Sequence, residues 1–113
     1  MNTQGRKAKG RSLVLEVKQW LHNIFPQLVD HDIIVPAASA SGADLVLSPE
    51  CQKVFPFAVE CKRQEGLSKV YAFVDQAKQN ANGLMPVVIA RSNRKEAIVI
   101  LTLTDFEKLI GEQ

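Results

Sequence analysis

The sequence predicts an α/β (α+β) protein in which helices flank a mixed central β-sheet. Apolar residues recur at helical spacing over residues 13–24 and again over residues 70–81. Strand-like segments, which are β-branched, continuously apolar or alternating between apolar and charged residues, lie at 33–35, 43–47, 57–62, 86–90 and 97–101. A last helix should start near Thr104, where the sequence fits a capping box. The expected order of elements is therefore α-β-β-β-α-β-β-α.

The composition indicates a soluble globular protein. A chain of 113 residues is long enough to bury one hydrophobic core and too short for two. No apolar run approaches the length of a membrane span, and the N-terminus lacks the apolar segment of a signal peptide. Cys51 and Cys61 are too few for a disulfide framework and lack the spacing of a zinc site. We therefore expect a cytoplasmic protein with two reduced thiols and no membrane partner.

A basic segment precedes the first predicted helix. Residues 1–10 are polar and contain two glycines, so we expect a flexible arm before a single domain over residues 11–113. Ser12 is the expected N-cap of the first helix. The cations that would contact DNA phosphates are Arg6, Lys7, Lys9 and Arg11. A disordered tail that only keeps the protein in solution is the alternative.

Two neighbouring segments combine acidic and basic residues in a strand-like pattern. Side chains alternate between the faces of a strand, so Glu60 and Lys62 should share one face. Residues 43–47, which contain Asp44, also have strand character, and residues 48–53 are interpreted as the turn between two antiparallel strands. In that hairpin Asp44 and Glu60 would be diagonal neighbours about 7–8 Å apart, a span that one cation can bridge.

Asp44 followed by Glu60-Cys61-Lys62 resembles the D…(D/E)-x-K signature of the PD-(D/E)XK nuclease superfamily, most closely its archaeal-type Holliday-junction resolvase branch. The resemblance covers Gly10 to about Thr104, although the superfamily often has proline where this chain has Ala43. It implies a restriction-endonuclease-like core and a metal-dependent deoxyribonuclease that acts in DNA recombination or repair.

The resemblance also implies a role for each motif residue. Asp44 and Glu60 would hold Mg²⁺, with Mn²⁺ as a substitute, and the backbone carbonyl of Cys61 would be a further ligand. Magnesium is favoured over zinc because the ligands are oxygens and the sequence offers no set of His and Cys. Lys62 would orient or deprotonate the attacking water.

Two residues on the predicted helices match further site positions of the superfamily. Glu16 matches an acid on the first helix that joins the metal site, and the alternative is a solvated glutamate paired with Arg11 or Lys18. Gln76 matches a glutamine that faces the active site, and the alternative is a boundary residue whose amide lies in water.

Three other polar features have different interpretations. The loop before Asp44 resembles a Ser/Gly-rich loop of resolvases, so Ser39 or Ser41 could donate to a phosphate oxygen, although a plain flexible connection is possible. The polar cluster over residues 30–32 is expected to be a loop rather than a metal site, because adjacent residues do not readily converge. His22 is expected on the helix surface.

Together these patterns favour a Mg²⁺-dependent DNA endonuclease directed at branched or junction DNA. Resolving a four-way junction needs two active sites across a two-fold axis, so a homodimer is expected. The apolar residues that could pair the subunits, or fill a monomer core instead, are Phe55, Phe57, Tyr71 and Phe73. The alternatives are a less structure-selective repair or degradation nuclease, and a non-catalytic nucleic-acid-binding domain with Glu60 and Lys62 as an exposed ion pair.

Overall fold

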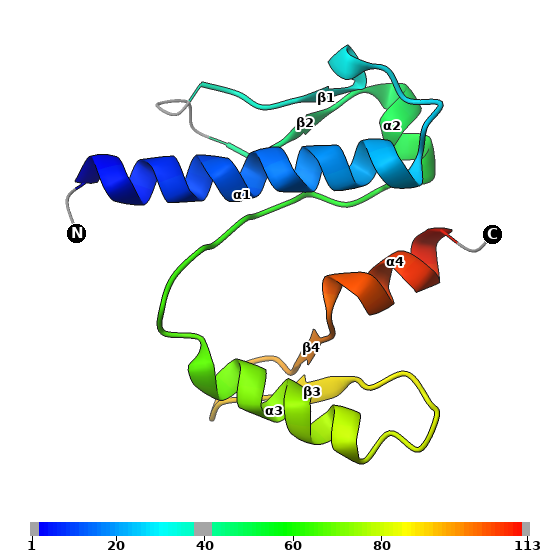
Figure 1. Ribbon diagram of the computed structural model, residues 1–113. Helices are drawn as coiled ribbons and strands as arrows, with labels where there is room; N and C mark the ends of the chain where they lie inside the picture. Colours follow the sequence, from blue (N-terminus) through cyan, green and yellow to red (C-terminus); the bar gives the residue numbers. More distant parts are fainter. Residues whose placement is uncertain (1–2, 38–41, 112–113) are drawn as a thin grey trace. The chain divides into compact units, whose positions relative to one another are not determined.

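The computed structural model describes residues 3–37 and 42–111, with only the course of the backbone over residues 3–10. The chain divides into two compact units, Met1–Arg63 and Gln64–Gln113. Within the described residues the fold is mixed α+β, with four α-helices and two antiparallel two-stranded sheets (Figure 1). The predicted mixture of helices and strands is therefore confirmed. The single mixed sheet, the predicted order of elements and a restriction-endonuclease-like core are not.

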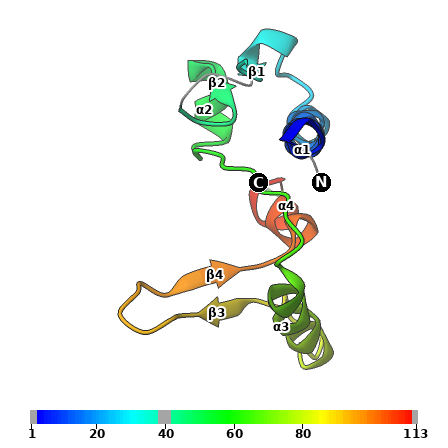
Figure 2. The same ribbon diagram turned by 90° about the vertical axis from the view of Figure 1, so that its left-hand side faces the viewer.

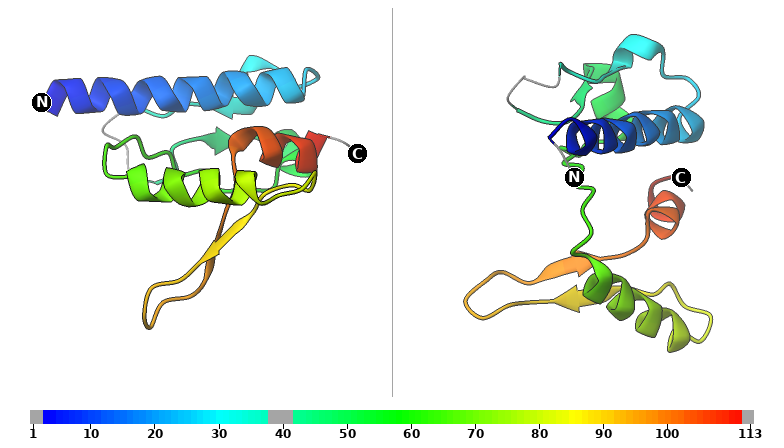
Figure 3. Two further views of the ribbon diagram at one scale, coloured as in Figure 1. Left: turned by 60° about the horizontal axis from the view of Figure 1, so that its bottom comes forward. Right: turned by 60° about the vertical axis from the view of Figure 1, so that its left-hand side comes forward.

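The first unit begins with helix α1 (Thr3–Ile24), which starts earlier than the sequence predicts (Figure 3). Ser12 lies well inside this helix, so its prediction as the N-cap is wrong. Apart from one glycine, residues 4–9 are good helix formers, which favours a helical backbone over this segment. The helix ends at Ile24, where the predicted helical pattern ends, because the ring of Pro26 cannot continue the helical hydrogen bonds.

A short sheet follows α1 in the first unit. Strand β1 (Ile33–Ile34) is preceded by a 3-10 helix, η1 (Asp30–Asp32), and pairs antiparallel with strand β2 (Val46–Leu47). Ile33 lies opposite Leu47, and Ile34 lies opposite Val46. Both strands fall where the sequence predicts them, but the partner of β2 is β1 rather than residues 57–62.

Helix α2 (Pro49–Val54) occupies the segment predicted to be a turn. Ser48 is its N-cap, since the Ser48 hydroxyl accepts from the Cys51 N–H at 3.1 Å, and Pro49 stands at the first helical position, where proline is favoured. The predicted tight hairpin is therefore wrong, because this capped helix is inserted between its two arms. Residues 55–62 form no regular strand.

The core of the first unit combines α1, β1 and α2. Leu21, Ile33 and Cys51 are fully enclosed. The ring of Phe55 packs edge-on against Trp20, with the ring centroids 6.2 Å apart. Phe55 is only 2% exposed, so it belongs to this core and is not available for pairing subunits.

The second unit contains a helix, a hairpin and a final helix. Helix α3 (Ser68–Gln79) is followed by strands β3 (Val88–Ala90) and β4 (Ile98–Ile100), which pair antiparallel as Figure 2 shows. Both strands lie within the predicted runs. After α3, Asn82 and Gly83 adopt positive φ angles of 52° and 85°, a conformation that asparagine and glycine tolerate better than other residues.

Helix α4 (Leu103–Gly111) closes the second unit. It is capped one residue before its start, because the Thr102 hydroxyl accepts from the Asp105 N–H at 3.1 Å. The cap is therefore Thr102 and not Thr104. Over the described part of the chain, no helix combines the length and the apolar character that a membrane crossing requires.

Candidate functional site

Asp44 contacts the segment that carries the rest of the predicted motif. Its Oδ2 atom accepts a hydrogen bond of 2.6 Å from the Cys61 N–H, and its own N–H donates to the Val59 carbonyl at 3.3 Å. A short bond from an N–H to a carboxylate is charge-assisted and stronger than a bond between neutral groups. Asp44 is thus fixed to residues 59–61 by both its side chain and its backbone, although no regular strand pairing joins the two segments.

Glu60 and Lys62 form an ion pair beside this contact. The Lys62 Nζ atom lies 3.2 Å from the Glu60 Oε1 atom, so the two side chains share one side of the segment, in agreement with the strand-like alternation. The Glu60 side chain is 60% exposed and the Lys62 side chain is 69% exposed. Such a pair adds little stability, because water screens the attraction, and it can therefore be exchanged for other partners.

Burial and both carboxylates act on the pKa of the Cys61 thiol. Burial is the main cause that raises the pKa of this half-buried thiol, and the negative charges of Asp44 and Glu60 raise it further. Both acids therefore act on one residue, the middle one of the predicted motif.

The oxygen atoms around Cys61 suit a hard cation. Asp44 uses Oδ2 for the Cys61 N–H and Glu60 uses Oε1 for Lys62, so a cation would take the other oxygen of each acid together with the Cys61 carbonyl. Across residues 3–37 and 42–111, no three side chains of His, Cys, Asp or Glu are grouped to hold a metal ion. Mg²⁺ commonly binds through one or two carboxylates and keeps several waters, so a magnesium site would need few ligands from the protein.

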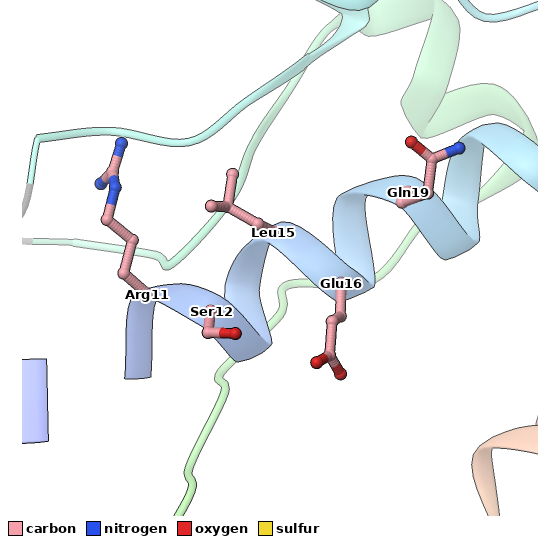
Figure 4. Close-up of a pocket in the computed structure, with 5 residues that line it drawn as sticks. All are labelled: Arg11, Ser12, Leu15, Glu16 and Gln19. Carbon is pink, nitrogen blue, oxygen red and sulfur yellow. The ribbon is translucent and has the colours of Figure 1, made fainter. Parts of the chain in front are cut away.

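Glu16 lies on the exposed surface of α1. It lines a shallow pocket with Arg11, Ser12, Leu15 and Gln19. In Figure 4 its carboxylate and the Arg11 guanidinium point away from the helix in opposite directions. The pairing with Arg11 or Lys18 that the alternative interpretation proposed is not seen: Arg11 donates to the Pro36 carbonyl at 3.4 Å, and Lys18 pairs with Asp30 at 2.8 Å. The role of Glu16 at a metal stays a prediction.

The other candidate residues are described only in part. Arg11 lies beside Pro36, just before the Ser/Gly-rich loop, but Ser39 and Ser41 of that loop lie outside the described residues. Arg6, Lys7 and Lys9 belong to the helical backbone of α1, and their side chains are not described. Gln76 is exposed on α3 in the second unit, and its role in the site stays a prediction.

Asp32 is a buried carboxylate whose importance the sequence did not reveal. It accepts from the Ser48 hydroxyl at 2.6 Å and from the Val29 N–H at 2.7 Å. These bonds, that from Ser48 first, hold the pKa of Asp32 below its ordinary value. The cluster over residues 30–32 is thus a 3-10 helix ending in a bonded acid, not a simple loop. The Ser48-Pro49 pair, a helix-start signal, could have identified one of the two partners.

His22 also differs from its prediction. It is half-buried rather than on the helix surface, and its Nε2 atom is enclosed without a hydrogen-bond partner among the described residues.

Comparison of the chain with protein-family models, with curated proteins and with solved structures found no match. The functional assignment therefore depends on the residues and contacts of this chain.

Proposed function

We propose that the chain is a Mg²⁺-dependent DNA endonuclease that acts inside the cell as a homodimer on junction or branched DNA. The proposal rests chiefly on the 2.6 Å hydrogen bond from the Cys61 N–H to Asp44, which joins the first acid of the motif to Glu60-Cys61-Lys62. The ion pair between Glu60 and Lys62 lies on the same segment, on either side of Cys61 in the sequence. Cys51 and Cys61 are free thiols, which suits a reducing compartment.

The chemistry assigned to each residue follows from the needs of phosphodiester hydrolysis. Asp44, Glu60 and the Cys61 carbonyl would hold Mg²⁺, with Mn²⁺ able to substitute. When bound, the cation supplies a Lewis acid for the phosphate and lowers the pKa of a water molecule. Lys62, whose Nζ atom lies beside Glu60, would orient the attacking water through its ammonium or, as the neutral amine, accept a proton from it. We expect products with 5′-phosphate and 3′-hydroxyl ends.

Glu16, Gln76 and the basic start of α1 complete the proposal. Glu16 is assigned as an additional acid of the metal site, and Gln76 keeps the role that the resemblance implies for it. The residues assigned to DNA phosphates are Arg6, Lys7, Lys9, Arg11, Ser39 and Ser41. Contacts of this kind position the protein on DNA without reading its sequence.

The proposal is tested by offering the purified chain four kinds of DNA with and without Mg²⁺, while its mass in solution is measured. The substrates are a four-way junction, a nicked duplex, a linear duplex and a single strand. We expect paired symmetric nicks in the junction by a dimer, with no scission in EDTA. A monomer that cuts linear duplex or single strands equally well would exclude junction resolution and favour the less structure-selective nuclease.

A non-catalytic nucleic-acid-binding domain is the second candidate. The exposed ion pair between Glu60 and Lys62 favours it, because this pair already balances the charges that catalysis would use. In that case the chain would bind DNA and leave it intact at every concentration of Mg²⁺ or Mn²⁺.

A further inference from the structure

The segment from Asp44 to Ser48 is held at both ends. At its start, Asp44 bonds to Val59 and Cys61. At its end, the Ser48 N–H donates to the Asp32 carbonyl at 2.9 Å and the Ser48 hydroxyl donates to Asp32 Oδ1 at 2.6 Å. An extended chain advances about 3.3 Å per residue, so a one-residue shift at the Ser48 end would move Asp44 by a similar distance. That displacement exceeds the length of the Asp44 bond to Cys61.

The β1–β2 sheet has little else to fix its register. Its ladder contains two residue pairs, Ile33 with Leu47 and Ile34 with Val46. Ile33 is buried, but Ile34 and Val46 are 47% and 49% exposed and equally apolar. A one-residue slip exchanges the faces of a strand, and the hydrophobic pattern opposes a slip only when the two faces differ in polarity. Here both faces are apolar, so polar contacts must specify the register.

We propose that Asp32 and Ser48 are positioning residues for Asp44: their hydrogen bonds fix the β1–β2 register and so deliver the Asp44 carboxylate to the Cys61 N–H. We call this pair the Asp32–Ser48 clamp. Asp32 is itself oriented, because its second carboxylate oxygen accepts from the Val29 N–H at 2.7 Å.

The clamp also determines where helix α2 begins. The Ser48 hydroxyl that donates to Asp32 also accepts from the Cys51 N–H at 3.1 Å, which caps the helix. Helix α2 in turn leads the chain to residues 55–61. One side chain therefore links the two stretches that bring Asp44 and Cys61 together.

The inference is tested by NMR on the full 113-residue chain without DNA or metal, so its outcome is independent of the proposed nuclease activity. In the wild type, the short bond to a carboxylate should shift the Cys61 amide proton downfield. Ser48→Ala should remove much of that shift and weaken the contacts between Ile33 and Leu47. It should also speed hydrogen exchange of the Cys61 amide by about fivefold, which is the effect expected when one ordinary hydrogen bond is removed. Ser48→Thr keeps a hydroxyl and should preserve the wild-type signal.

Two control variants separate positioning from general destabilisation. Gln52→Ala removes a 2.9 Å bond from Gln52 Nε2 to the Leu47 carbonyl, beside the same strand, without touching the clamp. Cys51→Ala opens a void at a fully buried position of α2. The Cys61 amide proton should keep its downfield shift in both.

The proposal would be overturned by an unchanged Cys61 amide proton in Ser48→Ala, or by an equal shift in Cys51→Ala. Asp32→Asn repeats the test if Ser48→Ala does not fold, because it keeps the shape of the side chain but removes its charge and one acceptor. A Cys61 amide that is unchanged in Asp32→Asn would equally overturn the clamp.

Discussion

Replacing Asp44 separates its structural role from its proposed role at a metal. An asparagine keeps a carbonyl oxygen that can accept from the Cys61 N–H but carries no charge. An alanine removes both the charge and the acceptor, and it leaves the Cys61 N–H without the partner that lies 2.6 Å away in the native protein. The two variants should therefore differ in stability and agree in activity.

The size of the stability difference follows from the type of hydrogen bond that each substitution removes. A hydrogen bond to a charged group contributes about 1.5–3 kcal/mol, whereas a bond between neutral groups contributes about 1 kcal/mol. Because Asp44 is half-buried, we expect Asp44→Ala to lower the free energy of unfolding by about 2 kcal/mol and Asp44→Asn by about 1 kcal/mol or less. With a urea dependence of about 2 kcal/mol per molar, the urea midpoint of the Ala variant should fall by about 1 M.

Cleavage should be abolished in both variants, because each removes a ligand charge. Binding to the junction should persist, since one fewer negative charge relieves repulsion from the phosphates. Cleavage is measured as the rate of Mg²⁺-dependent scission, and binding is measured by DNA titration. Glu50→Gln is the matched control, because Glu50 is an exposed acid of the same unit that pairs with Lys53 at 3.0 Å. Wild-type cleavage by Asp44→Asn would refute the metal assignment, and wild-type stability of Asp44→Ala would refute the energetic role of the Cys61 bond.

Three further predictions address the proposed base, the buried acid and the basic start of α1. Lys62→Ala should reduce turnover by about 10²–10⁴-fold with little change in the Mg²⁺ concentration for half-maximal rate, while Lys53→Ala should cleave normally in the same assay. Because the pKa of Asp32 is lowered in the folded state, its carboxylate stabilises the fold above about pH 4, and this stabilisation disappears as the pH falls through the folded-state pKa. The urea midpoint should therefore decrease from pH 7 to pH 3 in the wild type, and it should decrease less in Asp32→Asn. A variant with Arg6→Gln, Lys7→Gln and Lys9→Gln should bind DNA with a weaker dependence on salt. The slope of log affinity against log salt concentration should fall by up to about 0.9 for each DNA phosphate that the variant no longer neutralises. An unchanged slope would show that these cations have no role in DNA binding.

Local pattern predicted four of the five strand segments correctly and brought Asp44 close to residues 59–61, but it did not predict the path of the chain between them. The alternation of side chains correctly placed Glu60 and Lys62 on one side. The runs at 86–90 and 97–101 correctly located β3 and β4. The segment over residues 48–53 was misjudged because serine and proline favour both turns and helix starts, and here the Ser48 cap makes the helical alternative the more stable one.

The contacts that sequence reasoning missed are between residues far apart in the chain. Asp32 and Ser48 are separated by 16 positions, and nothing in either local sequence identifies the other as its partner. The aromatic residues show the same limit. Phe55 and Phe57 are spaced as neighbours on one face of a strand, yet Phe55 is 2% exposed and Phe57 is 42% exposed. Which aromatic ring enters the core depends on the helices around it, including Trp20 of α1.

The ion pair between Lys62 and Glu60 is where the two candidate functions differ physically. Two unit charges about 4 Å apart in water attract by only about 1 kcal/mol, so this exposed pair is readily exchanged. In a metal-dependent nuclease, a doubly charged cation would replace Lys62 as the partner of Glu60, and the Lys62 ammonium would then be free to orient water. In a binding domain, Glu60 would keep Lys62 paired and weaken its attraction for phosphate. Glu60→Gln should therefore abolish cleavage if the chain is a nuclease, but strengthen DNA binding in either case, because the Lys62 charge is no longer balanced.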